Sequence, residues 1–199
     1  MQIIVGLGNP DAKYAANRHN AGFLALDAMA DHWSLGPWKK RFQAAACEGL
    51  IETGAGPKKV VLLKPATYYN EAGRAVGEAA RFYKVGAAAL TVFHDELDLA
   101  PGKFRLKTGG GHAGNNGLRS IMAHVPGDFR RARIGIGHPG DKNLVTPWVL
   151  SDFPKADRVW ANALFDAIAR ALPLLVEGQD DAFQTRVTHL APAPRPDPS

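Results

Sequence analysis

Apolar and polar residues follow two patterns along this chain, and their alternation predicts strands separated by helices. Short apolar runs bounded by turn-forming residues indicate buried strands at 2–7, 42–51, 58–64, 89–94 and 131–137. Apolar residues that recur every three or four positions predict helices at 20–33, 71–84, 117–124, 155–173 and 177–188. We therefore expect an α/β fold, a single three-layer domain in which a twisted mixed β-sheet is flanked by helices.

The chain has no internal repeats and no change of composition of the kind that marks a linker. Residues 1–190 are thus expected to form one domain, an ordinary size for a chain of 199 residues. The last residues, 191–199, are rich in proline and are expected to form a disordered tail.

Composition and charge exclude some classes of protein. Hydrophobic residues make up 46% of the chain, enough for a core, yet no uninterrupted apolar run approaches membrane-spanning length. The chain begins directly with an apolar strand, so we expect no signal peptide, no membrane association and a cytoplasmic location. The one cysteine, Cys47, excludes an intrachain disulfide and a cysteine-based metal site. A formal net charge of +5 is compatible with mere solubility and equally with an anionic partner such as RNA.

Polar side chains lie next to the ends of several predicted strands. Asn9 follows the first strand, Asn70 follows the third, and Asp95 follows His94 at the end of the fourth. Asn116 lies in the glycine-rich loop 109–117, and His19 lies just before the first predicted helix. Because sites in open α/β sheets collect at the carboxyl ends of strands, we expect these side chains to meet there.

This set of residues indicates a hydrolytic site. A histidine is suited to take a proton near neutral pH, an adjacent aspartate fixes its tautomer, and asparagine amides bind carbonyl oxygen without charge. A side-chain nucleophile is missing, because Cys47 lies in a strand without an activating neighbour and no serine stands in a Gly-x-Ser-x-Gly turn. Water is then the expected nucleophile. A positioned base raises the reaction rate by about 10²–10⁴-fold and an oxyanion donor by about 10²–10³-fold. Rate increases of this size suit hydrolysis of an ester better than that of an amide.

Each residue also has a plainer interpretation. Asn20, Asn70 and Asn116 are suited to cap helices, and Asn9 with Pro10 forms a common turn pair. A lone histidine such as His19 is usually a surface or capping residue, and the segment 95–98 also reads as a solvated acidic loop. The ligand spacing matches no standard metal motif, and Gly6-Leu7-Gly8 is only a partial dinucleotide-binding pattern because Asp11 replaces its third glycine.

Four segments, in order and spread over the first three quarters of the chain, resemble the motifs of bacterial peptidyl-tRNA hydrolases. They are Val5–Pro10 (VGLGNP) with Tyr14 and Arg18–Gly22 (RHNAG); Leu63–Gly73 (LKPATYYNEAG); His94–Leu99 (HDELDL) with Pro101–Gly102 and Gly109–Leu118 (GGGHAGNNGL); and Arg131–Pro139 (RARIGIGHP). Any one of these would be modest support, whereas four in register are highly specific.

The resemblance implies hydrolysis of the ester between a peptide and the 3′-terminal ribose of tRNA, which frees tRNA for reuse. It implies that His19 activates water, that Asp95 orients it, and that asparagines position the substrate, with Tyr14, Asn20 and Tyr69 lining the same region. The full set of implied substrate-binding residues is Asn9, Tyr14, Asn20, Tyr69, Asn70, Asn116, Lys107 and Arg133. Lys107 and Arg133 would hold the tRNA 5′-phosphate. The implied partner is peptidyl-tRNA, contacted at its 3′ CCA end, acceptor stem and 5′-phosphate. The protein would be a monomer without metal or cofactor.

The chain departs from the motifs at four positions. Asn115 stands where these enzymes usually have histidine, and Tyr69 stands in place of methionine. Asp11 replaces a glycine, and Asn17 replaces a threonine beside the expected base. None of these changes removes His19 or Asp95.

Two other functions remain open on sequence grounds. The first is a non-catalytic RNA-binding relative, because a plant organellar intron-splicing factor shares this fold. Retention of both His19 and Asp95 favours the enzyme. The second is a nucleotide-dependent enzyme, which rests only on the partial glycine pattern near residue 6.

Overall fold

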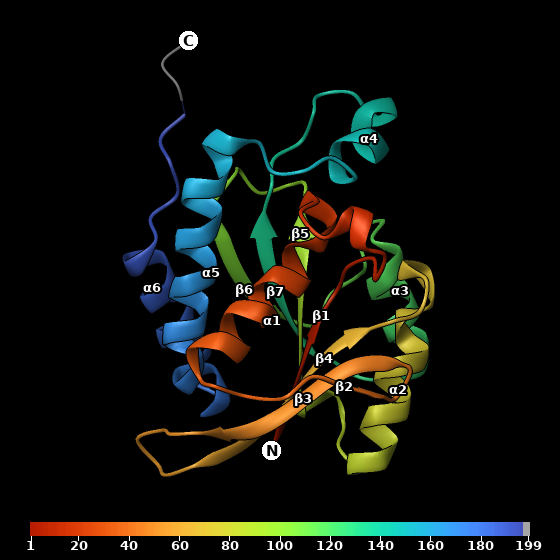
Figure 1. The fold of residues 1–199 in the computed structure, drawn as a ribbon, viewed down its shortest axis with the longest axis vertical. Coiled ribbons are helices and arrows are strands. Elements are labelled where there is room, and N and C mark those ends of the chain that lie inside the picture. Colours follow the sequence, from red (N-terminus) through yellow and green to blue (C-terminus); the bar gives the residue numbers. More distant parts are fainter. Residues whose placement is uncertain (197–199) are drawn as a thin grey trace.

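The computed structural model describes residues 1–196, and its centre is a seven-stranded sheet in the order β2-β3-β4-β1-β5-β7-β6 (Figure 1). The strands are β1 (Gln2–Gly6), β2 (Lys39–Arg41), β3 (Ala44–Ile51), β4 (Lys58–Pro65), β5 (Leu90–Glu96), β6 (Phe104–Thr108) and β7 (Arg130–Gly135). The central strands β4, β1, β5 and β7 run parallel, whereas β3 and β6 pair antiparallel with the strands they join. The sheet is therefore mixed, as predicted.

Helices cover both faces of the sheet and complete the three layers (Figure 1). They are α1 (Ala21–His32), α2 (Ala72–Tyr83), α3 (Asn116–His124), α4 (Val145–Val149), α5 (Lys155–Val176) and α6 (Asp180–Leu190). Short 3₁₀ turns are η1 (Ala12–Tyr14), η2 (Arg18–Asn20), η3 (Tyr69–Glu71), η4 (Ala87–Ala89) and η5 (Lys142–Leu144). The α/β prediction from the sequence is confirmed.

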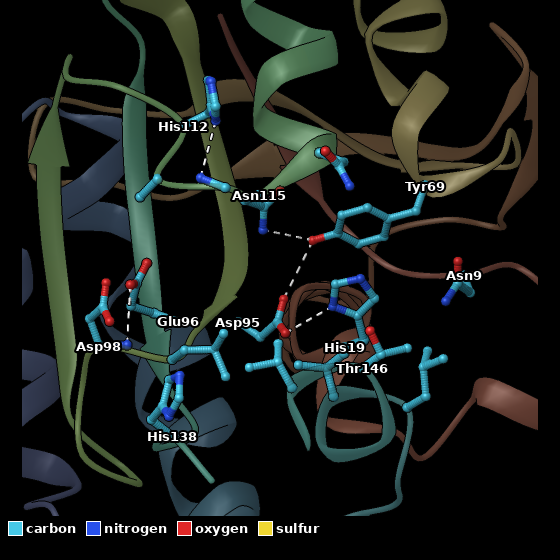
Figure 2. Close-up of a pocket in the computed structure, with 17 residues that line it drawn as sticks. Asn9, His19, Tyr69, Asp95, Glu96, Asp98, His112, Asn115, His138 and Thr146 are labelled. Atoms are coloured by element: carbon cyan, nitrogen blue, oxygen red, sulfur yellow. Dashed lines mark hydrogen bonds and ion pairs between the residues drawn. The ribbon is translucent and has the colours of Figure 1, made fainter. Parts of the chain in front are cut away.

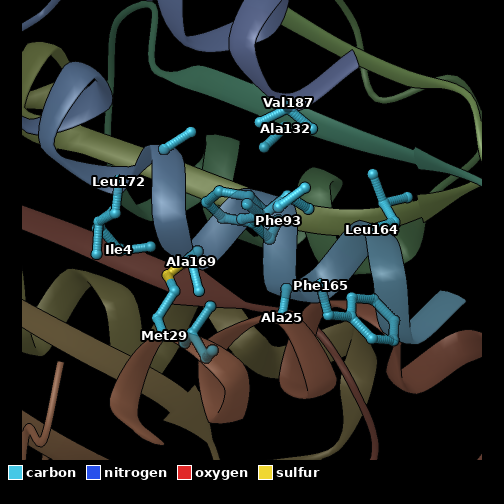
Figure 3. Packing of buried hydrophobic residues seen from close by; sticks show 14 of the residues in the cluster. Ile4, Ala25, Met29, Phe93, Ala132, Leu164, Phe165, Ala169, Leu172 and Val187 are labelled. Atoms are coloured by element: carbon cyan, nitrogen blue, oxygen red, sulfur yellow. The ribbon is translucent and has the colours of Figure 1, made fainter. Parts of the chain in front are cut away.

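Two apolar clusters join the layers. On one face, α1, α5 and α6 pack against the sheet, with Ile4, Met29, Phe93 and Leu172 among the fully buried residues (Figure 3). On the other face, α2 and α3 pack through Val76 and neighbouring residues. The central strands are buried on both faces, which explains their nearly continuous apolar runs in the sequence.

The sequence patterns missed three elements and misplaced several ends. Strands β2 and β6 are short and lie at the two edges of the sheet, where one side of each strand has no strand neighbour. Their polar residues therefore look like loops in the sequence. Helix α4 is only five residues long, too short to show a helical period of apolar residues in the sequence. Helix α5 was expected to end at Pro173 but continues through it to Val176.

Helix α5 is, within residues 1–196, the one helix that is long and apolar enough to cross a membrane by length and composition. Within the apolar 18-residue window of α5, 56% is buried inside the protein, where the helix packs against α1 and α6. This burial is typical of a core helix.

One close approach sets the position of the first helix. A Cβ atom on Gly22 would lie 2.3 Å from the carbonyl oxygen of Phe93 and 2.5 Å from the backbone nitrogen of Leu7. Only glycine leaves room for this contact between α1 and the strands below it. The turn η2, which carries His19, is thereby held at the carboxyl ends of β1 and β5.

The predicted boundary at residue 190 coincides with the end of α6, and the one-domain division stays a prediction. Of the expected tail, Ala191 is buried and Pro194 lies against Gly102, so its first part contacts the protein. The last part of the tail, 197–199, lies outside the described residues.

Candidate active site

A cavity of about 580 Å³ opens at the carboxyl ends of the parallel strands (Figure 2). It is bordered by β5, the start of α3, the turns η2 and η3, and helix α4. Among the residues that the sequence singled out, it is lined by Asn9, His19, Tyr69, Asp95 and Asn116. The expected meeting at one end of the sheet therefore occurs for Asn9, His19, Asp95 and Asn116, but not for Asn70.

His19 and Asp95 form a direct pair, although they are separated by 76 positions. The Nδ1 atom of His19 lies 2.9 Å from Oδ2 of Asp95. Because an ionised carboxylate only accepts, Nδ1 is assigned as the donor, and Nε2 is left unprotonated. Asp95 is nearly buried at the end of β5, whereas 19% of the His19 side chain is exposed. The free nitrogen can therefore take a proton from a water molecule in the cavity.

Tyr69 contacts both members of this pair. Its ring stacks on the His19 imidazole, with 3.9 Å between centroids and 18° between planes. Its hydroxyl lies 3.4 Å from Oδ1 of Asp95 and accepts from the side-chain amide of Asn115 at 3.0 Å. Burial, and then the charge of Asp95, raises the pKa of Tyr69 well above its usual range, so the phenol stays neutral.

The asparagines divide into two groups. Asn9 and Asn116 line the cavity, whereas Asn70 is exposed in η3 and is not part of this lining. Asn116 does not cap α3, because the N-cap is Asn115, whose side-chain oxygen accepts from Leu118 N–H at 3.0 Å. The capping interpretation of Asn116 is thus wrong by one residue.

The capping interpretation of Asn70 is also wrong, whereas Asn20 occupies the N-cap position as predicted but does not cap with its side chain. Asn70 lies inside η3, and the residue that precedes α2 is Glu71. Asn20 precedes α1 but makes no capping hydrogen bond, and its side chain bonds to the backbone of Asn9 instead. Tyr14 lies beside Asn9 in an adjoining cavity that also includes Tyr68 and Leu150.

Lys107 and Arg133 lie together in a second cavity of about 300 Å³. It adjoins the first, because Glu96, His112 and Ala113 line both. Arg133 approaches Glu96 at 3.5 Å, which leaves much of its guanidinium free to bind an anion.

Sequence reasoning missed a third cation in this second cavity, Arg131. It donates to the backbone oxygen of Gly110 at 2.7 Å and stacks over Phe129, and burial lowers its pKa. The signal was present: alternate residues of a strand share a face, so Arg131 and Arg133 on β7 had to point the same way.

The sequence also gave no indication of the contacts of Arg18. Its guanidinium lies 3.7 Å above the ring of Trp148 in α4, donates to Trp148 and Ser151, and pairs with Asp157. Helix α4 contributes Val145, Thr146 and Val149 to the main cavity. The residue next to His19 therefore fixes one wall of the site.

Among the described residues, no cysteine or serine lines the cavity, and the hydroxyl of Thr146, which does line it, has no hydrogen bond to a base that would activate it. Neither Cys47 nor any of Ser34, Ser120 and Ser151 lines it, and burial raises the pKa of Cys47 to about 11. Within residues 1–196, no three His, Cys, Asp or Glu side chains are grouped so that they could hold a metal ion. The arrangement is suited to attack by a water molecule that a histidine activates.

Comparison with known proteins points to a single family. The model of the peptidyl-tRNA hydrolase family matches residues 3–194. A peptidyl-tRNA hydrolase of Maricaulis maris is 61% identical over 98% of this chain and 95% of its own length. One of Caulobacter vibrioides is 56% identical over 100% of this chain and 97% of its own. The crystal structure of peptidyl-tRNA hydrolase from Acinetobacter baumannii is 40% identical, covers 97% of both chains and superposes with a TM-score of 0.89.

Proposed function

Because the chain belongs to the peptidyl-tRNA hydrolase family, it hydrolyses the ester between a peptide and tRNA, and we propose that His19 and Asp95 perform this reaction with water as the nucleophile. The observation that carries the assignment is the 2.9 Å contact between Nδ1 of His19 and Oδ2 of Asp95 beside the main cavity. This contact leaves Nε2 of His19 free to act as the base.

The proposed reaction proceeds in two steps. Nε2 of His19 takes a proton from water while the water oxygen attacks the ester carbonyl carbon. Asp95 stabilises the imidazolium that forms. When the tetrahedral intermediate collapses, the bond to the ribose oxygen breaks and His19 returns the proton to that oxygen. The products are a peptide with a free carboxylate and tRNA with a free terminal hydroxyl.

The amide side chains that border the cavity bind the substrate in this proposal. Asn9 and Asn116 donate to carbonyl oxygens of the peptide and to the developing oxyanion, because uncharged donors suit both. Asn20 supports Asn9 through its backbone. Tyr14 and the exposed Asn70 contact the bound peptidyl-tRNA outside the main cavity.

The tRNA itself binds at two places in this proposal. The CCA end enters the main cavity. Lys107 and Arg133 hold the 5′-phosphate in the second cavity, and the acceptor stem spans the distance between the two cavities. A net charge of +5 favours approach of the polyanion. We further propose that the enzyme works in the cytoplasm as a monomer and needs no cofactor, and that residues 1–190 form one domain.

The test is release of the labelled acyl group from N-blocked aminoacyl-tRNA in the presence of a chelator. His19→Ala should lower kcat by about 10²–10⁴-fold, the range that a positioned base contributes. His189→Ala is the matched control, because His189 is exposed on α6, away from the site. A His19→Ala variant as active as this control would overturn the assignment. Unimpaired tRNA binding with no turnover in the native chain would favour the non-catalytic RNA-binding function.

A further inference from the structure

Two of the four residues at which the chain departs from the motifs it resembles are in contact with each other. Tyr69 and Asn115 come from η3 and from the loop before α3, and the amide of Asn115 donates to the Tyr69 hydroxyl at 3.0 Å. Figure 2 shows this bond as one end of an uninterrupted path that continues through Asp95 to His19. The path connects the amino end of α3 to the proposed base.

Every hydrogen bond in this path has a fixed direction. The side-chain oxygen of Asn115 is occupied by the N–H of Leu118, so its amide nitrogen must face Tyr69. The Tyr69 oxygen therefore accepts from Asn115, and its one proton is free to point to Oδ1 of Asp95. The other oxygen of Asp95 accepts from His19. Both carboxylate oxygens thus have a donor.

We propose that Tyr69, oriented by Asn115, is a positioning residue that holds Asp95 and His19 in the geometry in which Nε2 of His19 faces the attacking water. This inference rests on the proposed roles of His19 and Asp95. The hydroxyl prevents rotation of the Asp95 carboxylate, because rotation would break the bond to Oδ1. The stacked ring hinders rotation of the imidazole about its Cβ–Cγ bond, because the two ring centroids lie only 3.9 Å apart.

The role needs a phenol that keeps its proton. Burial and the neighbouring carboxylate raise the pKa of Tyr69, so the hydroxyl remains a donor throughout the neutral range. A methionine at this position would fill space beside His19 but would offer Asp95 no hydrogen-bond donor. If Tyr69 only filled space, its hydroxyl would not matter for kcat. If it positions Asp95, loss of the hydroxyl should lower kcat, and this difference makes the proposal testable.

The decisive variant is Tyr69→Phe, which keeps the stacked ring and removes only the hydroxyl. Its matched control is Tyr83→Phe, which removes a hydroxyl bonded to Glu48 at 3.0 Å at the far end of α2. We expect Tyr69→Phe to lower kcat about tenfold, the effect of one hydrogen bond to a charged group. The KM should change less than twofold, since the hydroxyl contacts protein atoms. Tyr83→Phe should leave kcat unchanged.

A second variant tests the path from its other end. Asn115→Ser keeps an oxygen that can cap α3 but removes the amide that orients Tyr69. It should lower kcat by a factor close to that of Tyr69→Phe, and the double variant should lose little more, because both remove the same restraint. Urea unfolding of each variant shows whether the chain is still folded.

The spectroscopic readout is the ¹⁵N NMR spectrum of labelled histidine. The native protein should show His19 in one tautomer, with the proton on Nδ1, and Tyr69→Phe should show a mixture. A native kcat in Tyr69→Phe, together with an unchanged His19 tautomer, would overturn the proposal. Activity retained in His19→Ala would instead overturn the proposed function, so the two failures are distinguishable.

Discussion

Asn20 and Asn9 are bonded to each other twice, side chain to backbone. The side-chain oxygen of Asn20 accepts from Asn9 N–H at 2.8 Å, and its amide donates to the Asn9 carbonyl oxygen at 3.0 Å. Asn20 is 2% exposed, so water cannot replace these bonds. The pair ties the loop after β1 to the turn that carries His19, and so sets the position of one wall of the site relative to the base.

Asn20→Ala should therefore cost stability and activity together. It leaves the backbone N–H and carbonyl of Asn9 without their partner, which should lower the free energy of unfolding by about 2 kcal/mol. The displaced Asn9 should lower kcat/KM. Urea unfolding and steady-state kinetics measure the two effects, with Asn162→Ala on the exposed face of α5 as the control.

Asn20→Asp keeps one of the two hydrogen bonds to Asn9 and removes the other. The carboxylate still accepts from Asn9 N–H, but its second oxygen faces the carbonyl oxygen of Asn9 and repels it. We expect a loss of stability at least as large as in Asn20→Ala. Native stability in both variants would show that the paired bonds do not hold the loop.

Asn20 and His19 show which features of the site can be predicted from the sequence: the grouping of side chains can, whereas the hydrogen-bond partner of a particular side chain cannot. Strand ends are set by local apolar patterns, and the carboxyl ends of parallel strands share an edge, so the grouping of Asn9, His19 and Asp95 was predictable. The partner of a particular amide was not, because a cap and a cross-loop bond require the same residue type. The sequence therefore predicts side-chain caps at both Asn20 and Asn116.

The same limit applies to elements that tertiary packing creates. Strands β2 and β6 have no apolar run of their own and form because a neighbouring strand offers them hydrogen bonds. Helix α4 is too short to be stable alone and is held by the contacts of Trp148 with Arg18 and with the carbonyl oxygen of Gly137. Neither kind of element has a local signal that a periodicity analysis can find.

The proposed phosphate site makes a prediction about substrate chemistry. Lys107→Ala and Arg133→Ala should each raise KM about tenfold for a substrate with a 5′-phosphate, since each removes a charge-assisted contact. The same substitutions should change KM much less for a substrate that ends in a 5′-hydroxyl. Lys40→Ala, on the exposed edge strand β2, is the control for loss of charge alone. Equal effects on the KM of both substrates would show that the 5′-phosphate does not bind in this cavity.

Stability should depend on pH through His94, which is buried beside Asp95. Its Nδ1 donates to the carbonyl oxygen of Asp95 at 2.8 Å, and its Nε2 has no hydrogen-bond partner. Burial lowers the pKa of His94, with a further decrease from Arg133, although the hydrogen bond and the charges of Asp95 and Glu96 oppose the shift. The neutral ring is therefore the form that the folded protein favours.

The sign of the effect follows from proton uptake. With its pKa lower in the folded than in the unfolded state, His94 binds more protons after unfolding, so stability decreases as pH falls below the unfolded value of about 6.5. The native protein should thus lose more unfolding free energy between pH 7.5 and pH 5.5 than His94→Gln does, by at most about 1.4 kcal/mol per pH unit. Urea unfolding at several pH values measures both slopes, and parallel slopes would contradict this role of His94.

Arg18 should control the wall of the cavity that α4 forms. Its guanidinium is buried, stacks on Trp148 and pairs with Asp157, so it joins α4 and α5 to the turn that carries His19. A lysine in its place keeps the charge but cannot stack as a plane or donate from several nitrogens at once. Arg18→Lys should therefore lower the unfolding free energy by about 1–2 kcal/mol and raise KM several-fold. Hydrogen exchange should become faster in α4 while that in the central strand β1 stays native. Arg186→Lys on the exposed face of α6 is the control, and slow exchange of α4 in Arg18→Lys would show that the helix is held by its other contacts.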